Sequence, residues 1–95
     1  MPAYVIVNIA IKDPERYEQY KRLAAPTVAL YGGRYVARGG CAEALEGSMI
    51  PKRIVLLQFD TTERAKQWWD SPEYREARGI RQSCADTDMI VVEGM

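Results

Sequence analysis

Residues Ala3–Ile11 read AYVIVNIAI, a short run dominated by β-branched and other apolar residues. Such a run is typical of a β-strand, in which successive side chains point to opposite faces of a sheet. One face would be wholly apolar, formed by Val5, Val7, Ile9 and Ile11. The other would be mostly apolar, formed by Tyr4, Ile6, Asn8 and Ala10. Because solvent disfavours a large exposed apolar surface, we expect both faces of this strand to be covered.

Three further strands follow from the same kind of pattern. Arg34–Arg38 is short and bounded by glycine pairs, and Arg53–Phe59 is nearly continuous in apolar residues, which predicts a central strand. Met89–Glu93 is predicted as the last strand. The connector Cys41–Lys52 contains turn-forming residues, with a short extended piece expected at Glu43–Leu45.

Two helical regions separate these strands. Asp13 and Pro14 form a helix start, in which Asp13 accepts a backbone hydrogen bond and Pro14 occupies the first helical position. Pro26 is expected to kink or break this helix before it ends at Tyr31. Residues 60–63 (DTTE) predict a second start, with a helix to about residue 70, and Ser71 is expected to cap a further helix.

The predicted order is therefore strand, helix, strand, strand, helix, strand. Right-handed crossovers place both helices on one face of a four-stranded antiparallel sheet, which is the α+β ferredoxin-like βαββαβ fold in a single domain over residues 1–95. Ile6, Ile54 and Leu56 fall on the sheet face that no helix covers. We therefore expect a homodimer formed through this open face, with Asn8 and Gln58 directed toward the partner.

Charge and composition restrict the partners. Thirteen basic residues balance thirteen acidic ones, so the net charge is zero. This balance argues against nucleic acid and against a polybasic membrane anchor as partners. No apolar run approaches the ~20 residues that a membrane-spanning helix needs. Cys41 and Cys84 lack metal-binding or redox spacing, so they are expected to be reduced thiols in a cytoplasmic protein.

Several stretches together resemble the DUF1330 family of the dimeric α/β-barrel superfamily. They are residues 3–6 (AYVI), 32–40 (GGRYVARGG), 45–47 (LEG), 51–55 (PKRIV), 68–74 (WWDSPEY) and 91–94 (VVEG). The resemblance spans nearly the whole chain in the family's order. It implies a ferredoxin-like fold that pairs sheet to sheet into a barrel, in a bacterial family without an assigned reaction. Many members carry His where this chain has Tyr31, so no role of that His is carried over.

The chain contains no histidine. This removes the commonest general base at neutral pH, the usual proximal haem ligand and most zinc sites. We therefore predict no metal site and no cofactor.

Arg34 and Arg38 are the first candidates for ligand binding. Four positions apart on one strand, they are expected to share a face with Val36 between them, where both guanidinium groups could hold a carboxylate or an enolate oxygen. The alternative is a solvated edge strand that charge protects from aggregation.

Aromatic residues of the helices supply the other candidates. Tyr20, Tyr31 and Trp68 would line a semi-polar pocket between helices and sheet, because buried hydroxyl and indole N–H groups need partners. In this hypothesis Tyr20 or Tyr31 donates a proton and Arg38 stabilises negative charge, so that the domain binds or converts a small organic molecule without metal or haem. Glu46 and Arg81 are weaker candidates.

Two other interpretations stay open. The domain would be a non-catalytic structural or regulatory dimer if its aromatic residues serve only the core. A third interpretation is an interaction module whose edge strand recruits another protein.

Overall fold

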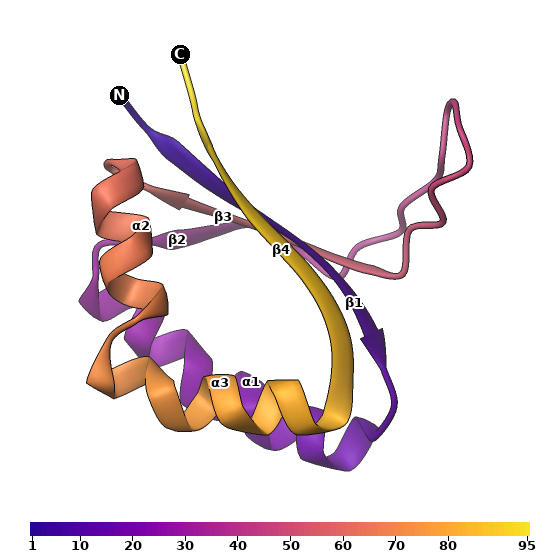
Figure 1. Cartoon of the computed structure of the whole chain (residues 1–95), viewed down its shortest axis with the longest axis horizontal. Coiled ribbons are helices and arrows are strands. Elements are labelled where there is room, and N and C mark those ends of the chain that lie inside the picture. Colours follow the sequence, from indigo (N-terminus) through magenta and orange to yellow (C-terminus); the bar gives the residue numbers. More distant parts are fainter.

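The computed structural model describes residues 1–95 and shows the predicted order of elements (Figure 1). The elements are β1 (Ala3–Ile11), α1 (Pro14–Leu30), β2 (Arg34–Arg38), β3 (Arg53–Phe59), α2 (Thr62–Trp69), α3 (Pro72–Cys84) and β4 (Ala85–Glu93). The strands form one antiparallel sheet in the order β2-β3-β1-β4. The ferredoxin-like prediction is confirmed, and no helix is long and apolar enough to cross a membrane.

All three helices start with a side-chain cap: Asp13 and Ser71 are the predicted ones, and Thr61 lies within the start predicted at residues 60–63. The side chain of Asp13 accepts a hydrogen bond from the Arg16 amide at 3.3 Å, and that of Thr61 accepts from Arg64 at 3.0 Å. Ser71 accepts from Tyr74 at 3.1 Å. Each cap satisfies an amide that has no partner within its helix.

The break that was one of the two predicted effects of Pro26 is absent, because α1 continues from Pro14 to Leu30 with the proline inside it. Ala24, Thr27 and Val28 around the proline are all buried in the core. Their packing on one continuous helical face outweighs the ~3 kcal/mol that an interior proline costs.

The last strand also begins earlier than predicted, at Ala85, directly after α3. Asp86 and Asp88 have a low preference for strands. These two residues and Thr87 between them nevertheless pair in register with residues 8–10 of β1. Long-range pairing therefore extends β4. The expected extended piece at Glu43–Leu45 is absent, because these residues form no regular structure.

The two faces of the sheet differ as predicted. The side that carries the helices holds the core, whose largest fully buried side chains are Trp68, Tyr74, Phe59, Val28 and Cys84. The opposite side, called the open face below, carries half-exposed Ile6, Ile54 and Leu56 and the exposed β4 residues Ile90 and Val92. In Figure 1 the helices lie together on one side of the strands. The open face is thus an apolar surface that its own chain leaves uncovered.

Candidate functional site

A bulge in β2 separates the two arginines that were expected to act together. Arg34 pairs with Gln58 and Tyr35 with Leu57, but Ala37 pairs with Leu56, so Val36 is the extra residue. An extra residue shifts the alternation by one position. Arg34 therefore lies on the open face, whereas Arg38, opposite buried Val55, lies on the helix side. The prediction that they share a face is wrong.

Each arginine has its own local contact. Arg34 donates a hydrogen bond from Nη2 to Oε1 of Gln58 at 2.6 Å. The Arg38 guanidinium lies over the Tyr35 ring, with Cζ 4.3 Å from the ring centroid. Asn8 and Gln58 do not bond to each other, because Asn8 contacts the backbone of Ile50 and Lys52 instead. One ligand cannot meet both arginines on the same side of the sheet.

The aromatic residues between α1 and the sheet are closely packed. The hydroxyls of Tyr20 and Tyr74 are hydrogen-bonded at 2.9 Å, and Nε1 of Trp68 donates to Oγ1 of Thr27 at 3.0 Å. The rings of Trp68 and Tyr74 lie 4.2 Å apart. Their polar groups are thus satisfied within the chain, and burial raises the pKa of Tyr20 well above its usual value.

A cavity of about 20 Å³ lies beside this cluster, between α1 and the sheet. Tyr20, Trp68 and Arg38 line it, as the sequence predicts, and Arg53 and Lys21 lie at its basic side. This volume has room for about one water molecule. Three of the predicted site residues therefore lie around one cavity, but it is too small for an organic ligand. Arg34 and Tyr31 do not border it.

Tyr31 lies outside this cluster, at the corner where α1 meets α3. Its hydroxyl donates to Oε1 of Glu73 at 2.8 Å, and Arg64 lies over its ring at 4.6 Å. The hydrogen bond to the carboxylate raises the pKa of Tyr31 and lowers that of Glu73. The contact joins two helix ends and leaves Tyr31 away from Tyr20.

A second opening lies on the other side of the core, where α2 and α3 face the edge strand β4. This cleft, called the β4 cleft below, has a volume of about 340 Å³. It is lined by Val5, Ala65, Lys66, Trp69, Arg81, Gln82, Thr87, Met89, Ile90 and Val91. Apolar walls with a few polar groups are typical of small-molecule sites.

Arg81 is the unusual residue of the β4 cleft. Its side chain is only 4 % exposed, yet it forms neither an ion pair nor a hydrogen bond, and its Nε is buried without an acceptor. Oγ1 of Thr87, which borders the same cleft, is also buried without a partner. Buried charges in proteins are almost always paired. The cleft therefore offers unused hydrogen-bonding capacity for an anion.

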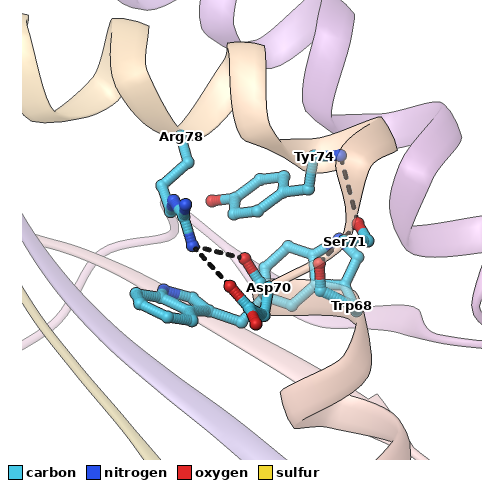
Figure 2. Close-up of polar contacts among 6 residues, drawn as sticks. Trp68, Asp70, Ser71, Tyr74 and Arg78 are labelled. Carbon is cyan, nitrogen blue, oxygen red and sulfur yellow. Dashed lines mark hydrogen bonds and ion pairs between the residues drawn. The ribbon is translucent and has the colours of Figure 1, made fainter.

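The junction of α2 and α3 adjoins Trp69, which lines this cleft. Figure 2 shows polar contacts at this junction, among them that of Arg78 with Asp70. Arg78 donates from Nη1 to the carbonyl of Trp69 at 2.9 Å and lies 3.7 Å from the Asp70 carboxylate. The Arg78 guanidinium also lies over the Trp69 ring, with Cζ 4.3 Å from its centroid. These contacts hold the Trp69 side chain in place at the cleft.

Arg81 lies between the β4 cleft and the aromatic residues of the core. Its Cζ lies 6.0 Å from the centroid of the Tyr20 ring. Tyr20, the proton donor of the sequence hypothesis, therefore lies behind Arg81 and does not border the cleft. It is placed to support the guanidinium rather than to touch a ligand there.

Arg81 was predicted only as a weak candidate, although the sequence of α3 contains a signal for it. Tyr74, Ala77, Arg81 and Cys84 are all buried and recur at spacings of three and four, which is one face of α3. A single arginine within an apolar stripe is the pattern that could have identified the site. No group of three or more His, Cys, Asp or Glu side chains is placed to hold a metal ion.

Comparison with known proteins gives the family. Residues 2–95 match the domain of unknown function DUF1330. The chain belongs to the DUF1330 family. The match covers nearly the whole of this DUF1330 chain and confirms the resemblance seen in its sequence stretches.

Solved structures agree on the fold. A protein of unknown function from Rhodopseudomonas palustris is 20 % identical, with a TM-score of 0.81 over 99 % of this chain and 82 % of that one. A dimeric ferredoxin-like protein of unknown function from Jannaschia sp. is 11 % identical, with a TM-score of 0.73 over 99 % and 100 %. SnoaB, a cofactor-independent oxygenase from Streptomyces nogalater, is 8 % identical, with a TM-score of 0.68 over 99 % and 93 %. At these identities the likeness shows the fold of the DUF1330 chain alone. No curated protein is significantly similar to it.

Proposed function

We propose that this DUF1330 domain binds a small organic anion in the β4 cleft, with Arg81 as the residue that holds its charged oxygen. The observation that carries the proposal is the buried Arg81 guanidinium, which has no acceptor in its own chain. The cleft volume of about 340 Å³ suits a compact molecule with an apolar body.

Energetics support an anion as the ligand. A buried, unpaired charge is costly, by several kcal/mol even after relaxation of the protein and entry of water. A carboxylate, phenolate or enolate oxygen would remove that cost and accept charge-assisted hydrogen bonds from Arg81. Thr87 and Gln82 border the same space and supply further polar groups, while Lys66 adds a second positive charge.

Conversion of the ligand without metal or haem is the finer part of the proposal. The oxygenase activity named for SnoaB is the reaction to test first, by analogy of fold alone. In such chemistry Arg81 would stabilise the negative charge that develops on an enolate or phenolate oxygen. Tyr20, a candidate from the sequence, would support Arg81 from behind. Arg38 borders the inner cavity and would stay outside the β4 cleft.

We also propose that the working unit is a homodimer formed through the open face. Support comes from the uncovered apolar residues Ile6, Leu56 and Ile90, and from the Jannaschia relative, which is described as dimeric. The cytoplasm is the proposed compartment, because Cys41 is exposed and Cys84 buried, and both thiols are free.

The test is ligand binding by the wild-type protein and two variants. Aromatic and aliphatic carboxylates and phenols would be screened by thermal shift, and positive compounds measured by calorimetry, with oxygen consumption followed in parallel. Arg81→Met should lose binding by about tenfold or more, because it removes the charge but keeps an apolar stem. Arg75→Met is the matched control, since Arg75 is an exposed arginine on the same helix.

Equal affinity in wild type and Arg81→Met would contradict the proposal. A panel in which no anion binds would favour the second candidate, a non-catalytic structural or regulatory dimer. The observation that favours this alternative is the close packing of Tyr20, Trp68 and Tyr74, which leaves only about 20 Å³ beside them.

A further inference from the structure

Residues 39–52, called the arm below, leave the sheet between β2 and β3 and extend away from the rest of the chain. In Figure 1 the arm, coloured magenta to red, projects on the side of the sheet opposite to the helices. Residues 39–50 are all exposed, and Leu45 is 97 % exposed. Long loops without secondary structure are uncommon in small domains and usually serve a function.

The base of the arm is held to the open face by specific contacts. Asn8, which points to the open face, accepts a hydrogen bond from the Lys52 amide at 2.8 Å and donates to the Ile50 carbonyl at 3.4 Å. The Gly39 amide donates to the Ile54 carbonyl at 2.8 Å. Both ends of the arm are therefore fixed, which gives it a defined direction.

Gly39 has a structural reason to be glycine. Its φ of +75° is one that residues with a Cβ rarely adopt, and an added Cβ would collide with the Arg53 guanidinium. The chain thus turns sharply out of β2 at this position and directs the arm past the open face.

The arm carries apolar side chains that its own chain does not cover. Leu45, Met49 and Ile50 are all exposed. Ile50 also borders the open-face surface around Asn8 and Ala10, which is mostly polar and includes Lys52, Asp86 and Asp88, so the base of the arm adjoins the open face. Because Glu43, Glu46 and Lys52 are its only charged residues, the arm has no basic patch for nucleic acid or a membrane.

We propose that the arm packs against a second copy of the chain and forms part of the dimer interface. Sheets that pack face to face lie about 10 Å apart, so an arm that projects from the open face must run alongside the partner. Burial of Leu45 and Met49 there would remove apolar surface from water and clamp the two copies. This inference rests on the proposed homodimer through the open face.

The first test measures the dimer dissociation constant by analytical ultracentrifugation. Replacing both Leu45→Ser and Met49→Ser should raise it by about tenfold or more, because apolar interface residues commonly account for that much. Leu30→Ser is the matched control, since Leu30 is 59 % exposed at the end of α1, away from the open face. Circular dichroism would show that each variant is folded.

The failure of each proposal would look different. A wild-type protein that stays monomeric at high concentration would overturn both the homodimer and the role of the arm. A dimer that Ile90→Lys dissociates but that Leu45→Ser with Met49→Ser leaves unchanged would overturn the arm alone.

The second test uses Cys41, the exposed thiol on the arm. In a Cys84→Ala background, a maleimide–benzophenone attached to Cys41 should give a covalent dimer on irradiation. When copies of light and heavy isotopic composition are mixed, cross-links that join a light peptide to a heavy one should appear. Capture only within the labelled copy would contradict the proposal.

Discussion

Arg81 is a charged residue on the apolar stripe of α3, and its position explains why it can serve a ligand. The residues around it on the stripe, Ala77, Ile80 and Cys84, are buried in the core. A guanidinium among them loses its hydration, and nothing in the chain replaces the lost hydrogen bonds at Nε. The fold therefore carries a cost at this residue that only an external acceptor would offset.

This cost predicts that Arg81→Met stabilises the free protein. Replacement of buried charged groups by apolar residues of similar volume is often neutral or stabilising, by about 1–4 kcal/mol. Chemical denaturation of the ligand-free protein would measure the change. Wild type should regain the difference when a binding anion is present, and the variant should not. A large loss of stability in Arg81→Met would contradict the interpretation.

Tyr20 predicts a dependence of stability on alkaline pH. Its pKa is raised in the folded state, chiefly by burial and then by Tyr74, so the neutral form is favoured there. The contribution is complete below the ordinary value near 10 and is lost as pH rises from 10 toward the folded pKa. Tyr20→Phe should lower stability at pH 7 by about 1–3 kcal/mol, because it removes the hydrogen bond to Tyr74.

Above pH 10 the Tyr20→Phe variant should lose stability less steeply than wild type. Urea unfolding curves between pH 8 and pH 11 would show this difference in slope. Parallel curves for the two proteins would show that Tyr20 does not titrate with unfolding.

The individual elements show how packing can override local preference. The bulge at Val36 in β2 places Tyr35 and Arg38 on the helix side and Arg34 on the open face. In α1, the buried residues before and after Pro26 keep the helix continuous. In each case the burial of neighbouring side chains determines the geometry of the element.

Pro26→Ala should therefore stabilise the protein. Alanine supplies an amide for the helix and removes the ring that crowds the preceding turn, a gain of up to ~3 kcal/mol. Part of the gain is offset because the unfolded chain becomes more flexible, by about 0.4–1 kcal/mol. Since Pro26 is exposed, no core contact is lost. The free energy of unfolding should rise by about 1–2 kcal/mol, and a decrease would show that the proline is needed where it stands.

In the molecule as a whole, the sheet separates the side of the core and the β4 cleft from the side of the open face. Its helix side holds the core and borders the β4 cleft, and its open face remains apolar and uncovered. Ile90, at 60 % exposed, is the most exposed large apolar residue of the strands. Such a surface on a small domain is typical of an interface.

We expect Ile90→Lys to dissociate the proposed dimer, because it places a charge in an apolar contact without a partner. Light scattering across a concentration series should show a monomer, while Leu30→Lys stays dimeric. An unchanged dimer would place the interface elsewhere.

Features that depend on neighbouring residues were predictable from the amino-acid sequence. Alternating apolar residues in β1 and β3 predicted strands with two distinct faces, and Asp13, Thr61 and Ser71 predicted helix starts. These follow from side-chain direction and from hydrogen bonds over three residues, which are local properties. The fold and the apolar open face therefore followed from the sequence.

Features that depend on distant residues emerged only when the chain was folded. Strand register placed Arg34 and Arg38 on opposite faces, and pairing with β1 extended β4 to Ala85. Arg81 gained its importance because α2, α3 and β4 together exclude water from it and offer no acceptor. Burial and pairing are set by residues far apart in the chain, and so the cleft and the missing acceptor of Arg81 appeared only in the folded molecule, although the apolar stripe of α3 already marked this residue.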